Sequence, residues 1–334
     1  GQKGIKYLGW AIALILFLLF PMAAGSFFGQ VMMYVGLFIL MGMGLNLELG
    51  LAGLLDLGFV AFFAAGAYTI ALFTADNAHL ILIFDRALNW WEALPLAMFV
   101  SLAIGVMFGI PVLKVRGDYL AVATMGLGEI VRVVVLSDMA RPLLGGSQGL
   151  LLIPRPWIGN FELNDPIYLF YLTLVCSCVA AYFAWALENS RLGRAWMAIR
   201  EDEDVGQALG INLVNVKLLA YGLGATFAGL AGAIFAIMLT SIFPHSFQLL
   251  ISINILALII VGGLGSLPGV VVGAAMLIGT PELLREFGEY RYLAYGAVLI
   301  IMMRVKPIGL WPSAARKREV TASEEVEAIL RAED

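Results

Sequence analysis

The sequence predicts an all-α polytopic membrane protein with about ten transmembrane helices. Of its 334 residues, 61% are hydrophobic and 13% are charged, a balance that a soluble domain of this length does not need. The apolar residues also form continuous runs, many of them close to the ~20 residues that cross a bilayer. A transmembrane β-barrel would instead alternate apolar and polar residues at every second position.

The spans are predicted from the apolar runs in chain order. The first run follows Lys3 and Lys6 and has the pattern of a signal peptide, but its length and its direct passage into the next run favour an uncleaved span. The ninth run is short and glycine-rich, so a broken or re-entrant segment is also compatible with it. The ten predicted ranges are 8–25, 30–47, 51–74, 93–113, 119–137, 166–187, 217–240, 249–264, 267–280 and 291–304.

Positive charges are distributed unevenly between the two sets of connecting segments. Fourteen of the 20 lysines and arginines fall on one side, five fall on the other, and Arg132 lies within a span. By the positive-inside rule, the side with fourteen is the cytoplasm. Both termini and the charged stretch 188–216, which we call the island, are therefore predicted to be cytoplasmic. The chain divides into a transmembrane domain, 1–312, and an acidic cytoplasmic tail, 313–334.

The island lies between two apolar runs and has helical spacing in both of its halves. Acidic residues favour the start of a helix, and a glycine such as Gly210 favours its end. We predict two short helices with a bend near 200–202. Their apolar faces favour a docking surface, and a solvated loop is the alternative. The apolar positions are Leu192, Ala195 and Ile199 in the first half, then Val205 and Leu209 in the second.

Polar residues surround a glycine-containing interruption between the second and third spans. Asn46, Glu48 and Asp56 bracket the sequence Gly50-Leu51-Ala52-Gly53. A broken helix exposes backbone polar groups that must be buried in protein or line a cavity. In transporters such helices often line the substrate path. The alternative is an ordinary cytoplasmic turn with Glu48 in water.

Two further spans carry polar residues. In the fifth span, Glu129 and Arg132 are three residues apart and therefore share a helix face, with Thr124 a little earlier. Because ionisable groups are costly inside a membrane, the two form either a structural ion pair or part of a gate or pathway. Asn254 in the eighth span can hydrogen-bond a neighbouring helix.

The sequence contains no recognisable catalytic or cofactor motif. The glycine-rich stretch 262–269 lacks the Lys-Ser/Thr pair of a phosphate-binding loop, and the two histidines, His79 and His245, are too far apart in the sequence to suggest a metal cluster. Cys176 and Cys178 point to opposite helix faces and are not expected to pair. The net charge of −4 argues against a nucleic-acid partner. We predict no catalytic residue, no metal and no cofactor, so transport energy must come from an ion gradient or a partner.

Several longer motifs resemble a known family. Together they extend over about 30–312, and the chain resembles the permeases of branched-chain amino-acid ABC importers, in particular the LivM type. The motifs that carry this resemblance are Gly44–Gly58, Gly66-Ala67-Tyr68, Thr124–Arg132, Asn189–Glu203, Gly262–Gly269 and Arg304–Leu310.

The resemblance implies a type II-like permease that translocates branched-chain amino acids across the bacterial inner membrane. The implied partners are a second permease in a heterodimer, two cytoplasmic ATPase subunits that use the ATP, and a periplasmic binding protein. The island is then the coupling segment. Its implied contact residues are Leu192, Ala195, Ile199, Arg200, Glu203, Asp204, Val205, Leu209 and Gly210. The candidate pathway residues are Asn46, Asp56, Tyr68, Thr124, Glu129 and Asn254.

Other functions stay open at this point. Related permeases carry urea, short amides or other small solutes, and the outer loop 141–153 departs from the glycine and asparagine pattern expected of close relatives. A gradient-driven secondary transporter is the alternative from another class, and the carboxyl groups of Asp56 and Glu129 support it. A membrane enzyme has no reactive constellation in its favour.

Overall fold

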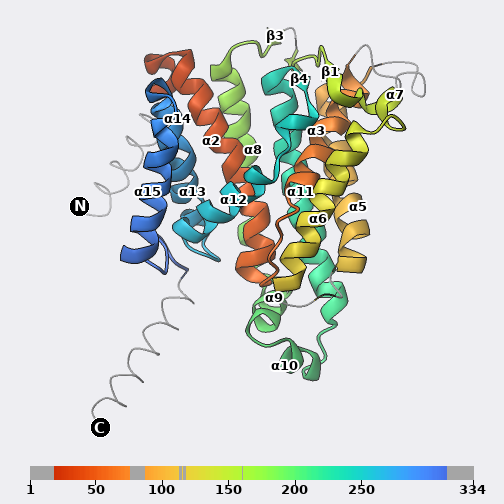
Figure 1. Ribbon diagram of the computed structural model, residues 1–334, viewed down its shortest axis with the longest axis vertical. Helices are drawn as coiled ribbons and strands as arrows, with labels where there is room; N and C mark the ends of the chain where they lie inside the picture. Colours follow the sequence, from red (N-terminus) through yellow and green to blue (C-terminus); the bar gives the residue numbers. More distant parts are fainter. Residues whose placement is uncertain (1–18, 76–86, 113–114, 116–117, 160, 314–334) are drawn as a thin grey trace.

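The helices run roughly side by side in a single elongated bundle (Figure 1). The structure is a computed structural model, and it describes residues 19–75, 87–112, 115, 118–159 and 161–313. The tail 314–334 and most of the predicted first span lie outside the described residues. The count of ten spans therefore stays a prediction.

Within the described residues, six helices are long and apolar enough to cross a membrane, and three apolar helices are shorter. The long ones contain α2 (Ser26–Leu45), α5 (Trp90–Val112), α6 (Asp118–Leu136), α8 (Pro166–Glu188), α11 (Leu213–Leu239) and α12 (Leu249–Gly262). The shorter ones contain α3 (Val60–Thr74), α13 (Leu267–Ala274) with α14 (Thr280–Leu283), and α15 (Tyr290–Val305). The chain is a multi-pass membrane protein.

Several predicted span boundaries are wrong, and α11, for example, begins at Leu213 rather than at 217. The second span begins at Ser26, and α2 runs on into a π-helix, η1 (Asn46–Leu51). The third span was predicted as 51–74, but α3 begins only at Val60, and residues 52–59 are not helical. Apart from Asp56, residues 51–60 are apolar or glycine, so hydropathy alone does not reveal where the backbone leaves the helix. Gly53, with φ +72°, takes a conformation that other residues rarely adopt.

The centre of the bundle is α11, which is buried over 78% of its apolar 18-residue stretch, and it packs on α3 and α5. Small residues allow this close contact. A Cβ on Gly232 would lie 2.1 Å from the Phe63 carbonyl oxygen, and one on Gly66 would lie 2.3 Å from the Gly229 carbonyl oxygen. Close approach of small residues is the usual basis of helix packing in membranes, where lipid removes the hydrophobic driving force between helices.

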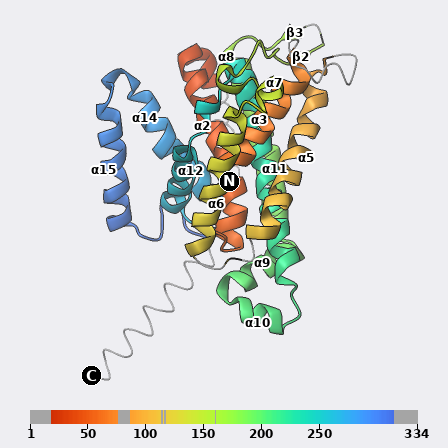
Figure 2. The same cartoon turned by 45° about the vertical axis from the view of Figure 1, so that its right-hand side comes forward.

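The two ends of the bundle differ in structure. One end, which we call the strand end, carries α7 (Arg141–Leu144), η2 (Gly146–Gln148), η3 (Pro244–Ser246) and two small antiparallel pairs. In these pairs β1 (Leu150–Leu151) joins β4 (Ser241–Ile242), and β2 (Trp157–Ile158) joins β3 (Phe161–Glu162). The opposite end, the island end, carries α9 (Arg191–Glu201) and α10 (Glu203–Ala208) (Figures 1 and 2). At one side of the bundle stand α14 and α15, with η4 (Ala275–Gly279) and η5 (Arg285–Phe287) next to them in the chain (Figure 2).

Candidate functional site

The interruption predicted between the second and third spans is a buried break in a helix. Every residue of η1 except Leu49 is buried, including Asn46 and Glu48. The alternative of a turn with Glu48 in water is therefore wrong, because the Glu48 side chain is fully buried.

Side chains accept hydrogen bonds from three backbone N–H groups around the break, as a buried break requires, and the Asn46 side chain of η1 accepts one from the α12–α13 turn. The four bonds run from Leu57 N–H to Thr124 Oγ1 at 3.0 Å, from Gly58 N–H to Asp56 Oδ1 at 2.6 Å, from Val60 N–H to Ser252 Oγ at 3.0 Å, and from Gly265 N–H to Asn46 Oδ1 at 2.9 Å. Three of the candidate pathway residues, Asn46, Asp56 and Thr124, therefore meet at this break. The Thr124 and Asp56 side chains accept from the backbone of the break, and the Asn46 side chain joins η1 to Gly265.

Two carboxyl groups lie together in the break. Glu48 and Asp56 are both fully buried, and both interact with the Tyr221 hydroxyl of α11. Among the described residues, no donor reaches either Glu48 carboxyl oxygen or Asp56 Oδ2 with hydrogen-bond geometry. Two carboxyl groups in contact can hydrogen-bond to each other only when one of them carries a proton.

The face of α6 beyond Thr124 carries charge. Arg132 Nη1 lies 3.1 Å from Glu129 Oε2, and the two side chains are 37% and 43% exposed. Next to them, a cavity of about 10 Å³ separates α6 from α3 and η3, which is room for a single water. Tyr68 and Arg132 both line it. In the described part of the chain, neither the Tyr68 hydroxyl nor Arg132 Nε has a hydrogen-bond partner.

Asn254 lies apart from the other candidate pathway residues. Its Oδ1 accepts a hydrogen bond from the Tyr295 hydroxyl of α15 at 3.1 Å. The two residues line an open cavity of about 490 Å³ between α2, α12, α14 and α15. Asn254 thus bonds across helices, which is the usual role of a lone amide in a membrane helix.

The island forms two short helices that meet at Asp202, as the spacing predicts. Side-chain caps fix where each helix begins. Ser190 Oγ accepts from the backbone N–H groups of Leu192 and Gly193, and Asp202 Oδ1 accepts from those of Asp204 and Val205. Gly210, with φ +85°, follows α10.

The apolar residues of the island do not form one exposed face. Ile199 is 2% exposed, so its expected contact with a partner is wrong for this structure. It packs against Gly206, where a Cβ would lie 3.1 Å from Ile199 Cγ2. Leu192 and Ala195 are half-buried, whereas Val205 and Leu209 are 55% and 76% exposed. Spacing places these residues on helix faces, but it cannot tell which face the two helices turn toward each other.

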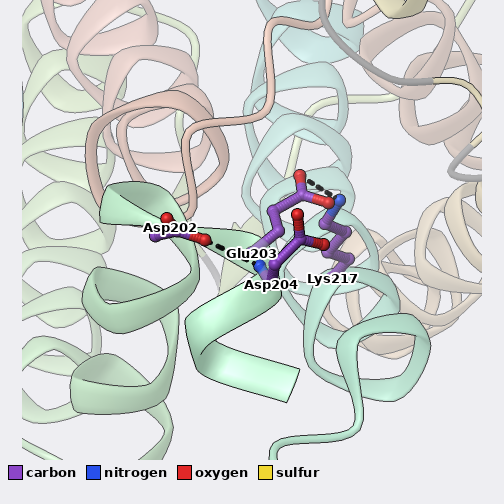
Figure 3. A network of polar contacts seen from close by, with 4 residues as sticks. All are labelled: Asp202, Glu203, Asp204 and Lys217. Atoms are coloured by element: carbon purple, nitrogen blue, oxygen red, sulfur yellow. Dashed lines mark hydrogen bonds and ion pairs between the residues drawn. The ribbon is translucent and has the colours of Figure 1, made fainter. Parts of the chain in front are cut away.

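Two polar contacts made by charged side chains join the island to the bundle. Lys217, 5% exposed on α11, holds Glu203 with Nζ 2.5 Å from Oε1, and Asp204 lies beside this pair, whereas Asp202 lies away from it and caps α10 (Figure 3). Arg200, at the end of α9, reaches the break, where Nη1 donates to the Gly50 carbonyl oxygen at 2.5 Å. Sequence reasoning assigned Arg200 to a partner contact and did not anticipate this bond, because nothing in the chain relates positions 150 residues apart.

Over the described ranges, no group of three or more His, Cys, Asp or Glu side chains is placed to hold a metal ion. The arrangement instead combines a broken helix, a charged pair on a lightly buried helix and an island that touches the break. In transporters, discontinuous helices of this kind often lie at the substrate site.

Comparison with known proteins identifies the family. A family model described as the permease component of the branched-chain amino acid transport system matches residues 27–303. The chain belongs to this permease family. The LivM permease proteins of the high-affinity branched-chain amino acid transport systems of Salmonella typhimurium and Escherichia coli K12 are similar to it. They are 38% and 36% identical over 299 residues, which cover 83% of this permease and 68% of each relative.

A second kind of permease protein is also related. The LivH permease protein of Escherichia coli K12 is 32% identical over 127 residues, which cover 37% of this permease and 41% of the relative. No solved structure matches the permease significantly. The family model and the LivM relatives confirm the resemblance that the sequence motifs predicted.

Proposed function

We propose that this permease is the translocation subunit of an ABC importer for branched-chain amino acids in the bacterial inner membrane, with cytoplasmic termini. The exposed ion pair of α6 carries the proposal. Only 22% of the α6 span is buried, and Glu129 and Arg132 are both partly exposed on it. A charged group facing hydrocarbon at the centre of a membrane costs about 3 kcal/mol or more. This face therefore fits a contact with a second permease and the solute path between the two.

The chemistry of that face suits the substrate class. A branched-chain amino acid combines an ammonium, a carboxylate and an apolar side chain. The α6 face offers an acid, a base and exposed apolar residues such as Ile130 and Val133. If the pair is purely structural, the outcome should be different. Replacing both charged groups with uncharged ones should then change the stability of the protein very little.

The double variant Glu129→Gln/Arg132→Gln separates the two roles. If the pair lies on the solute path, we expect the double variant to lower leucine uptake at least tenfold and to assemble normally. Normal uptake by this variant would remove the pair from the path.

The remaining partners follow from the same reading. Two ATPase subunits dock on the island through the exposed Val205 and Leu209, and a binding protein delivers substrate at the strand end. The relationship of the chain to both LivM and LivH permease proteins supports a heterodimer with a second permease. In this scheme ATP is consumed by the partners, and the permease itself holds no cofactor.

Reconstitution tests the proposal directly. We expect uptake of radiolabelled leucine into liposomes to require the second permease, both ATPases, the binding protein and ATP. Uptake by this chain alone, driven by a proton or sodium gradient, would replace the proposal with a secondary transporter. Competition by urea or short amides, but not by valine or isoleucine, would reassign the substrate.

Docking is tested by Leu209→Asp, which places a charge on the most exposed apolar side chain of the island's second half. We expect co-purification of the ATPases to fall at least fivefold. Met139→Asp is the control, because Met139 is 94% exposed at the strand end. Equal co-purification by the two variants would contradict docking at α10.

A further inference from the structure

Arg200 connects the island with the broken helix. Its Nη1 donates to the Gly50 carbonyl oxygen at 2.5 Å, although the residues are 150 positions apart in the chain. The stem of the side chain lies along the break, since a Cβ on Gly53 would meet Arg200 Cγ at 3.1 Å. The Arg200 side chain therefore contacts the break both at its aliphatic stem and at its guanidinium group.

The carbonyl that Arg200 reaches lies at a structurally sensitive point. Gly50 is near the end of η1, where carbonyl groups lack a partner within the helix and a positive charge is favourable. A side chain is excluded there, because a Cβ would lie 2.3 Å from Asn46 Oδ1 and 2.7 Å from Gly265 N. Any movement of Gly50 must therefore move its neighbours.

Through these neighbours the contact extends to a third element. Asn46 Oδ1 accepts from the Gly265 N–H, which joins η1 to the turn between α12 and α13. A Cβ on Gly265, at φ +72°, would lie 3.2 Å from the Gly50 carbonyl oxygen and 3.6 Å from Arg200 Nη1. Three elements, α9, η1 and the α12–α13 turn, thus meet at one arginine.

Other contacts hold the island in place without Arg200. The Lys217–Glu203 pair ties α10 to α11, and the Trp196 indole N–H donates to the Val216 carbonyl oxygen at 2.8 Å. The island arginine Arg194 does not reach the bundle in this way. It is exposed, and its Nη1 bonds to the Asn189 carbonyl oxygen within the island. Arg200 is thus well placed for a role beyond anchoring the island.

We propose that Arg200 is a positioning residue that transmits movement of the island to the break at Gly50 and to the α12–α13 turn. The inference rests on the proposed function, in which ATPase subunits dock on the island and move it. A displacement of α9 pulls on the Gly50 carbonyl, and the Asn46–Gly265 bond carries this displacement to the turn. Arg200 contacts neither ATP nor solute in this role.

The test compares Arg200→Met with Arg200→Lys in the complete transporter, with Arg194→Met as the control. We expect Arg200→Met to assemble with the other subunits. Leucine transported per ATP hydrolysed should fall at least tenfold. Arg200→Lys keeps a charge and one donor and should retain part of the coupling, and Arg194→Met should be unchanged.

A second readout follows the break itself. In the wild-type complex, ATP binding should change hydrogen–deuterium exchange of the backbone in 46–58, and Arg200→Met should abolish this change. Where Arg200→Met does not assemble, Arg200→Lys must show a weakened response of the same segment.

Normal transport per ATP with a wild-type exchange response in either Arg200 variant would overturn the inference. Failure of the wild-type complex to transport with ATP would instead refute the proposed function. The two failures are therefore distinguishable.

Discussion

Single side chains decide how the island is attached. Lys217 is buried on α11 and bonds Glu203, with a further acid, Asp204, beside the pair (Figure 3). Hydrogen bonds between charged groups are stronger than hydrogen bonds between neutral groups. The Ser190 and Asp202 side chains accept hydrogen bonds from backbone N–H groups and so set where α9 and α10 begin.

We expect Lys217→Met to destabilise the protein by about 1.5–3 kcal/mol, because Glu203 loses its bond to a cation and stays beside Asp204. The measurement is the thermal unfolding midpoint in detergent. Lys306→Met is the matched control, since Lys306 is exposed after α15. A midpoint for Lys217→Met that equals that of the control would show that the pair contributes nothing to stability.

At the scale of elements, glycines set how closely α3 and α11 approach. A Cβ on Gly232 would lie 2.1 Å from the Phe63 carbonyl oxygen and 2.7 Å from the Ala67 nitrogen. Both are backbone atoms, so no side-chain rotation can relieve the clash. The helices would have to separate where both are largely buried.

Gly232→Ala should therefore lower the yield of folded protein and the unfolding midpoint sharply. Gly126→Ala is the matched control, because the same substitution on α6 meets no heavy atom within 4 Å among the described residues. Alanine is the better helix former by up to about 1 kcal/mol, so we expect the control to be neutral or slightly stabilised. A tolerated Gly232→Ala would mean that α3 and α11 are less tightly packed than the structure indicates.

At the scale of the whole molecule, burial is unequal among the spans. The α11 span is 78% buried and the α6 span is 22% buried, yet α6 carries an ion pair. The exposed side of α5 differs, being apolar at residues such as Phe99, Met107 and Ile110. The contrast distinguishes a face suited to a protein partner from a face suited to lipid.

A photo-cross-linking amino acid at position 133 should therefore form a covalent adduct with the second permease in membranes. Val133 is 63% exposed and follows Arg132 on α6. The same amino acid at position 99, where Phe99 is 65% exposed on α5, should give no permease adduct. Equal adduct yields from the two positions would contradict a partner contact at α6.

The sequence by itself determined the class of protein, nearly all the apolar helices and the two helices of the island, because continuous hydrophobicity and helical spacing are local properties. It also located the break, from Gly50, Gly53 and the polar residues around them. The family resemblance came from motifs that the chain carries in linear order. The substrate and the partner subunits belong to the proposed function.

Only the tertiary structure decided what the polar residues contact. It buried Glu48 beside Asp56 and Tyr221, separated Asn254 from the break, turned Ile199 inward and brought Arg200 to Gly50. These outcomes depend on which helix faces meet and on residues that lie far apart in the chain. Periodicity assigns a residue to a helix face, whereas the packing of several helices decides whether that face meets protein, lipid or water.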